Sequence, residues 1–81
     1  MQITDLEVDD QNEAHLTRHG VTVAEIAQVF ANGPDVRRNR KSRTATHVAR
    51  GRTNGGRQVL IPFIDKGEGR VRPITAWEVG A

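Results

Sequence analysis

The chain lacks cysteine, a long apolar run and a start of the kind that secretory signals have. Without cysteine it forms no disulfide bond and no thiolate metal site, and it suits a reducing compartment. No run approaches the roughly 20 apolar residues that span a bilayer. The N-terminus has neither the basic start nor the apolar core of a signal peptide. We therefore expect a soluble, cytoplasmic protein with no membrane partner.

Acidic residues are also missing from one long stretch, between Asp35 and Asp65. Residues 37–57 carry a local charge of +8, residues 1–36 sum to −6, and the net charge of +2 conceals this split. Arginine dominates the basic block, and its planar guanidinium suits bidentate contact with a phosphate. The block predicts RNA binding, and a solvated basic loop is the plain alternative. The predicted RNA-binding residues are Arg37, Arg38, Arg40, Lys41, Arg43, Arg50 and Arg52.

The length of 81 residues predicts one domain, 1–81, with two short helices in its acidic half. Asp10, with Glu13 three residues later, has the spacing of a capping box and predicts a helix over about 11–19. Thr22 and Glu25 repeat this spacing and predict a helix over about 23–31. Helices of two to three turns are marginal alone, so both should pack on a sheet.

Strand patterns occupy the N-terminus and three segments after the helices. They cover 3–8, 44–52, 57–64 and 70–79, with an extra candidate at 35–41. Asn54-Gly55 predicts a hairpin in which both central residues have positive φ. The order β-α-α-β-β-β predicts an α+β fold, with two short helices packed on a three- to five-stranded antiparallel sheet.

Several short segments are spread over nearly the whole length of the chain: Leu6–Asn12, Arg18–Thr22, Ala24-Glu25, Val29-Phe30, Gly51–Thr53, Gly56-Arg57 and Arg72–Ala76. They resemble the BrnT-type toxins, bacterial ribonucleases of type II toxin–antitoxin systems that share a RelE-like fold. The resemblance implies a metal-independent endoribonuclease that acts on RNA and is neutralised by a cognate antitoxin. It implies no cofactor, and contact with operator DNA through the antitoxin complex.

The resemblance also implies catalytic roles for Arg57 and Arg72. Their strands are predicted hairpin neighbours, so both should reach one phosphate. Arginine stabilises developing negative charge but does not transfer protons at neutral pH. His47 is the candidate acid or base, and a packed, hydrogen-bonded histidine is the alternative. Strict alternation places it on the face opposite Arg50.

Two positions depart from the family pattern. Ala45-Thr46 stands where the family usually has Glu-Arg, and Trp77 stands where it usually has arginine. Two classes of function therefore remain open: a ribonuclease toxin, and a non-catalytic relative that binds nucleic acid or a protein. If the last strand keeps its alternation, we expect Trp77 to pack near Phe30 and Ile26, with Arg72 facing outward.

Histidine and aspartate pairs near the first helix have simpler interpretations than catalysis. His15 and His19 have metal-ligand spacing, but no third ligand is evident, so we predict no metal site. His19 is expected to act at the helix end, where a cation interacts with the helix dipole. Asp9 and Asp10 are expected to cap that helix.

Overall fold

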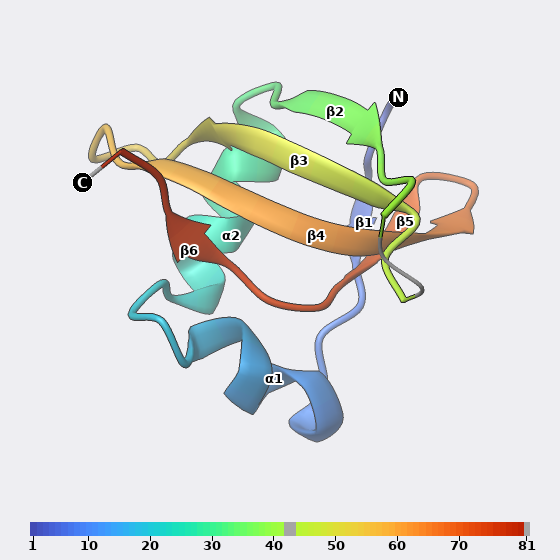
Figure 1. The fold of residues 1–81 in the computed structure, drawn as a ribbon, viewed down its shortest axis with the longest axis horizontal. Coiled ribbons are helices and arrows are strands. Elements are labelled where there is room, and N and C mark those ends of the chain that lie inside the picture. Colours follow the sequence, from blue (N-terminus) through green and yellow to red (C-terminus); the bar gives the residue numbers. More distant parts are fainter. Residues whose placement is uncertain (42–43, 81) are drawn as a thin grey trace.

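The structure is a computed structural model that describes residues 1–41 and 44–80. Within those residues the chain forms two helices and six strands (Figure 1). Their bounds are β1 Asp5–Leu6, α1 Asp10–Thr17, α2 Val23–Ala31, β2 Asp35–Arg38, β3 His47–Arg52, β4 Gln58–Gly67, β5 Arg70–Pro73 and β6 Trp77–Glu78. The predicted α+β class is confirmed, and neither helix is long and apolar enough to cross a membrane.

The sheet is mixed, so the antiparallel prediction was wrong at one edge. The strand order is β1-β5-β4-β3-β2, and β6 also pairs with β4. β1 runs parallel to β5, with Asp5 opposite Arg70 and Leu6 opposite Val71, whereas every other pair is antiparallel. The N-terminal strand thus joins the sheet beside a strand that comes 65 residues later in the chain, since Asp5 lies opposite Arg70. The candidate strand at 35–41 is present as β2, and the described strands exceed the predicted three to five.

The last predicted strand, 70–79, is interrupted. Pro73 ends β5. Ile74 still donates its N–H to the carbonyl of Pro62 in β4, but residues 74–76 lie outside the strands, and Trp77 and Glu78 then pair again with β4 as β6. Inside the interruption, Thr75 donates a hydrogen bond to the carbonyl of His15, and Ala76 is fully buried. Proline has no N–H to continue the ladder, and the interruption breaks the alternation on which the prediction for Trp77 depended.

Both helices begin at side-chain caps, but the first cap lies one residue before the predicted one. Asp9 is the N-cap of α1 and accepts from the backbone N–H groups of Gln11 and Asn12, while the Asn12 side chain accepts from the Asp9 N–H. The predicted Asp10–Glu13 box is therefore wrong. The box of Thr22 and Glu25 at α2 is confirmed.

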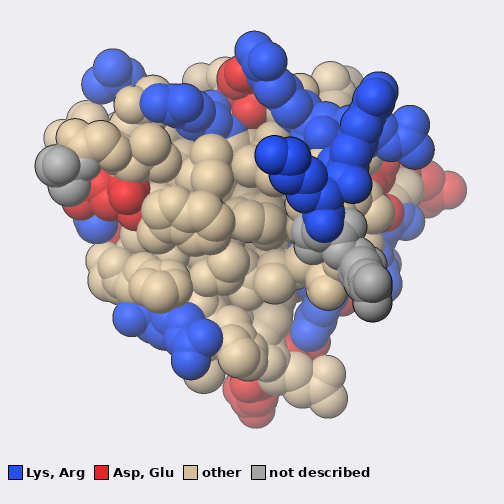
Figure 2. All heavy atoms as spheres, viewed as in Figure 1, with Lys and Arg blue, Asp and Glu red and all other residues tan. Residues whose placement is uncertain are grey.

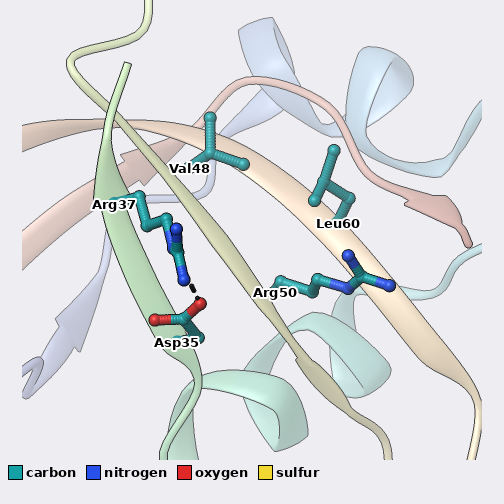
Figure 3. A pocket seen from close by; sticks show the side chains of 5 residues that line it. All are labelled: Asp35, Arg37, Val48, Arg50 and Leu60. Carbon is teal, nitrogen blue, oxygen red and sulfur yellow. Dashed lines mark hydrogen bonds and ion pairs between the residues drawn. The ribbon is translucent and has the colours of Figure 1, made fainter.

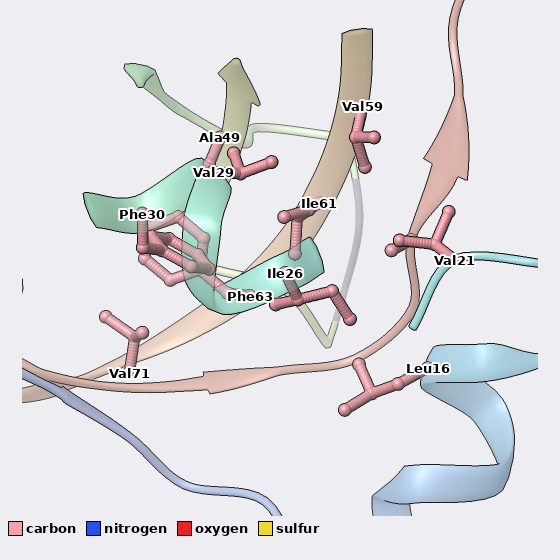
Figure 4. Packing of buried hydrophobic residues seen from close by; sticks show 11 residues of the cluster. Leu16, Val21, Ile26, Val29, Phe30, Ala49, Val59, Ile61, Phe63 and Val71 are labelled. Atoms are coloured by element: carbon pink, nitrogen blue, oxygen red, sulfur yellow. The ribbon is translucent and has the colours of Figure 1, made fainter. Parts of the chain in front are cut away.

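The core lies between α2 and one face of the sheet, which we call the helix face. Ile26, Val29 and Phe30 of α2 pack with the buried side chains of β3 and β4, and the rings of Phe30 and Phe63 meet edge to face at 5.5 Å (Figure 4). Alternation along β4 buries Val59, Ile61 and Phe63 and leaves the residues between them half-exposed on the opposite face. No helix covers that opposite face in Figure 1, and we call it the open face.

The two hairpins use positive φ differently. At the predicted Asn54-Gly55 turn, only Gly56 has positive φ, at +89°, and its N–H donates to the Thr53 carbonyl at 3.0 Å. The hairpin is thus present, but it is a three-residue connection with a left-handed glycine at its end. The two-residue turn with both φ values positive joins β4 to β5, at Glu68 and Gly69.

Candidate nucleic-acid interface

One row of paired residues crosses the open face. Asp35 of β2 pairs with Arg50 of β3, Arg50 pairs with Leu60 of β4, and Leu60 pairs with Trp77 of β6. Side chains at paired positions of neighbouring strands project from the same face of a sheet. The row therefore places an arginine, an apolar residue and the only tryptophan of the chain side by side on the open face.

An open hollow of about 360 Å³ lies at the β2 end of this row, lined by Asp35, Arg37, Val48, Arg50 and Leu60 (Figure 3). Val48 and Leu60 form its apolar part, and the two guanidinium groups stand at its sides. Nε of Arg37 donates to a carboxylate oxygen of Asp35 at 3.0 Å, but their side chains are 82% and 60% exposed. An ion pair so exposed contributes little and is easily exchanged for another anion.

The predicted RNA-binding residues gather around β2 and β3. Arg37 and Arg38 lie on β2, Arg50 and Arg52 lie on β3, and Arg40 and Lys41 follow β2. In the view of the open face, basic atoms lie along the edge formed by β2 and its following segment, beside an uncharged surface over β4 and β6 (Figure 2). Arg43 lies outside the described residues.

Most of these cations lack an acidic partner. Within residues 1–41 and 44–80, no carboxylate lies within ion-pair distance of Arg38, Arg40, Lys41, Arg50 or Arg52. All five side chains are exposed. By contrast, each of the arginines Arg37, Arg57, Arg70 and Arg72 has at least one carboxylate partner. The basic block therefore presents uncompensated positive charge to the solvent.

Arg57 is held by acidic residues on the helix side of the sheet. Its Nη1 donates to both carboxylate oxygens of Glu25, at 2.9 and 3.0 Å, and its Nε donates to Glu78 at 3.3 Å. The Thr22 N–H, which donates to the Glu25 carboxylate, and then the Arg57 guanidinium lower the pKa of Glu25. The contacts with Glu25 and then Glu78 raise the pKa of Arg57. Arg57 therefore stays charged and joins α2 and β6 to the start of β4, and we call such a linking arginine an arginine clip.

Arg72 forms a second such clip on the open face. Its Nη1 donates to Glu7 and to Asp9, both at 2.9 Å, and its Nη2 donates to Asp9 at 3.2 Å. The Arg72 side chain is only 19% exposed. Hydrogen bonding from Arg72 is the main cause that lowers the pKa of Asp9. Arg72 faces the open side of the sheet, as expected, but it is only partly exposed because acidic side chains already surround it.

The structure does not bring Arg57 and Arg72 together, so the expectation that both reach one phosphate was wrong. Arg72 pairs with Ile64, at the other end of β4 from Arg57. Seven residues of strand correspond to roughly 20 Å. Arg57 also contacts α2 on the helix side, whereas Arg72 lies on the open face. The two residues flank the same strand in sequence, but strand length and alternation separate them.

His47 lies away from both arginines. It pairs with Phe63 on the helix face, and the two rings stack at 5.6 Å with an interplanar angle of 16°. Its Nδ1 lies 2.9 Å from Oγ1 of Thr46. The predicted separation of His47 from Arg50 is confirmed, because Arg50 occupies the open face. The contacts of His47 are those of a packed, hydrogen-bonded histidine.

Sequence reasoning missed two features of the site. Trp77 is exposed on the open face, not packed near Phe30 and Ile26, because the strand is interrupted before it. Its ring contacts His19 edge to face at a centroid distance of 6.4 Å. The described residues hold no group of three side chains arranged to bind a metal. The other missed feature is the acidic partners of Arg57 and Arg72.

The fold and the interface were compared with known proteins. Neither the protein-family models, nor the curated proteins, nor the solved structures contain a match to this chain.

Proposed function

We propose that this protein is a BrnT-like module that binds RNA through the open face of its sheet and does not cleave it. The observation that carries the proposal is the contrast between two sets of arginines. Among the described residues, Arg38, Arg40, Lys41, Arg50 and Arg52 have no carboxylate partner, whereas Arg57 and Arg72 are each held by two. Phosphate groups supply the charge that the first set lacks.

The same contrast argues against catalysis by Arg57 and Arg72. To stabilise a transition state, each guanidinium would exchange contacts with two carboxylates for contacts with a phosphate. Glu25 and Asp9 are also capping residues of α2 and α1, so they are fixed in place by the helices. His47, the candidate acid or base, stacks on Phe63 on the helix face. We therefore propose that the protein binds RNA in the cytoplasm without cleaving it.

Salt dependence tests the proposal. If four to six phosphate contacts form, the logarithm of the binding constant should fall with the logarithm of salt concentration at a slope of about −3 to −4 on single strands. Fluorescence anisotropy of a labelled RNA measures this slope. Replacing both Arg50 and Arg52 by alanine should reduce its magnitude by about 1.4. Arg18→Ala is the matched control, since Arg18 is an exposed arginine on α1 outside the basic block.

Two kinds of result would count against RNA binding through the open face. An affinity that does not change with salt, or no binding at low salt, would contradict it. A loss of about 0.7 in the magnitude of the slope for Arg18→Ala, half that of the double variant, would show that total charge, and not the open face, governs binding.

A ribonuclease toxin is the second candidate, favoured by one observation. Glu7 and Asp9, which are carboxylates able to act as bases, lie 2.9 Å from the guanidinium of Arg72. In that case a cognate antitoxin would cover the open face, and the complex would contact operator DNA. Cleavage of a mixed RNA is the assay. Loss of Arg72 or Arg57 should then slow cleavage by a few hundredfold, and an inactive wild-type protein would exclude the toxin.

A further inference from the structure

We propose that Trp77 and Arg50 form a subsite for one nucleotide of single-stranded RNA, in which the base stacks on the indole ring and a phosphate binds the guanidinium. This inference rests on the proposed RNA binding and adds the form of RNA that is recognised. It concerns the only tryptophan of the chain and Arg50, which has no carboxylate partner among the described residues.

The register places the two side chains within reach of one ligand. Arg50 and Trp77 both pair with Leu60, from opposite sides of β4. Neighbouring strands lie 4.7–4.9 Å apart, so the backbones of Arg50 and Trp77 are separated by about 10 Å. The long arginine side chain spans part of this distance, and Leu60 provides an apolar surface between the two groups. A base on the tryptophan would therefore have its phosphate near the guanidinium.

Trp77 is exposed in a way that packing does not explain. The residue keeps 37% of its surface exposed, and among the described residues the only other exposed large apolar side chain is Met1 at the chain end. The ring contact made by Trp77 is with His19, which is itself exposed. A large aromatic ring on an uncovered sheet face is a typical stacking platform for bases.

Charge selects the partner. The hollow beside Leu60 is bordered by Arg37 and Arg50, and Arg52 extends the positive surface along β3. An anionic chain complements this surface, and its bases supply the flat rings that stack on Trp77. A duplex keeps its bases stacked on one another, so their faces are hidden from the protein. Single-stranded RNA is the occupant that satisfies both groups at once.

Trp77 also provides the measurement, because it is the only tryptophan. We would titrate the protein with a 12-nucleotide single-stranded RNA, the same sequence as a duplex, and an abasic strand of equal length. The single strand should change the Trp77 emission in parallel with anisotropy. The abasic strand should bind through its phosphates and leave the emission unchanged. A duplex that changes the emission as strongly as the single strand would overturn the stacking inference.

Substitutions separate stacking from charge. Trp77→Leu should weaken single-strand binding by about 5- to 150-fold without changing the salt slope. Trp77→Phe, which keeps an aromatic ring, should recover part of the loss and guards against a folding artefact. Arg50→Ala should reduce the magnitude of the slope by about 0.7. Thermal unfolding of each variant confirms that it is folded, and Arg18→Ala serves again as the control.

The two proposals fail in different ways. If RNA binds with the expected salt slope but Trp77→Leu binds as tightly as wild type, the subsite is overturned, the RNA-binding function stands, and the Trp77 surface is left to a protein partner. If wild type binds no RNA at low salt, both proposals fail together.

Discussion

Arg72 and Asp9 are joined by two hydrogen bonds, of 2.9 and 3.2 Å, between a guanidinium on β5 and the carboxylate that caps α1. The same guanidinium binds Glu7, which directly follows β1 in the chain. One side chain therefore connects the edge of the sheet to the start of the first helix. Arg57 makes the equivalent connection between β4 and the start of α2 through Glu25.

Acid should weaken both connections. The folded-state pKa values of Asp9 and Glu25 lie below the ordinary values of 3.8 and 4.5. A lowered pKa means that stability is fully present above the ordinary value and is lost as pH falls through the folded value. We expect the free energy of unfolding to be nearly constant from pH 7 to about 5 and to fall below that. Urea unfolding at a series of pH values measures it.

Charge-neutral variants identify the groups responsible. Asn is as good an N-cap as Asp, so Asp9→Asn keeps the cap of α1 and removes the ion pair with Arg72. Glu25→Gln does the same for the capping box of α2 and its contact with Arg57. Each variant should unfold more easily at pH 7 and lose less stability in acid than wild type. An unchanged pH dependence in both variants would show that other carboxylates govern acid unfolding.

Asn12 should be among the most sensitive polar positions. It is 94% buried, and its Nδ2 donates to the carbonyls of Glu7 and Pro73, at 3.0 and 3.1 Å. Asn12→Ala leaves these carbonyls without their donor and should destabilise the protein by about 1–3 kcal/mol. Gln11→Ala, at the exposed neighbouring position, should cost little. Urea midpoints compare the two, and equal midpoints would contradict the assigned role of Asn12.

Gly51 should not accept a side chain, although it lies in a regular strand. A Cβ there would lie 3.1 Å from Cβ of Pro34 and from Cγ1 of Val29, because α2 and the segment after it pack closely on β3. Gly51→Ala should therefore destabilise by about 1–3 kcal/mol. Gly55→Ala is the control, since its nearest heavy atom lies 3.9 Å away and its φ is not positive. Thermal unfolding that ranks Gly55→Ala as the more harmful change would refute this.

The free protein should report the position of Trp77 by its emission. We expect a red-shifted emission maximum, because the residue lies on the open face with 37% of its surface exposed. Iodide and the neutral quencher acrylamide should both reduce the emission intensity. Unfolded protein in urea is the reference for full exposure. A blue-shifted maximum that neither quencher affects would place the ring in the core.

Local patterns in the sequence were sufficient for the second helix and for most strands. The helix predicted over about 23–31 is observed at Val23–Ala31, since its capping box and its apolar face lie within one short segment. β3 and β4 were predicted from alternation and from an apolar run, although β3 begins at His47 and β4 continues to Gly67. The location of the basic block was likewise readable, because charge is a property of composition.

The tertiary structure alone decided which residues meet. The two carboxylate partners of Arg57 lie 21 and 32 residues away along the chain, those of Arg72 lie 63 and 65 residues away, and no local pattern specifies such pairs. Trp77 lies on the open face because β5 ends at Pro73, Thr75 bonds to the carbonyl of His15 in α1, and the chain pairs again with β4 in a register shifted by one residue. The sequence by itself thus determined the elements and the charge of this protein, through interactions between near neighbours. The parallel β1–β5 pair, the two arginine clips and the Arg50–Leu60–Trp77 row depend on collective packing of distant segments, which only the folded chain settles.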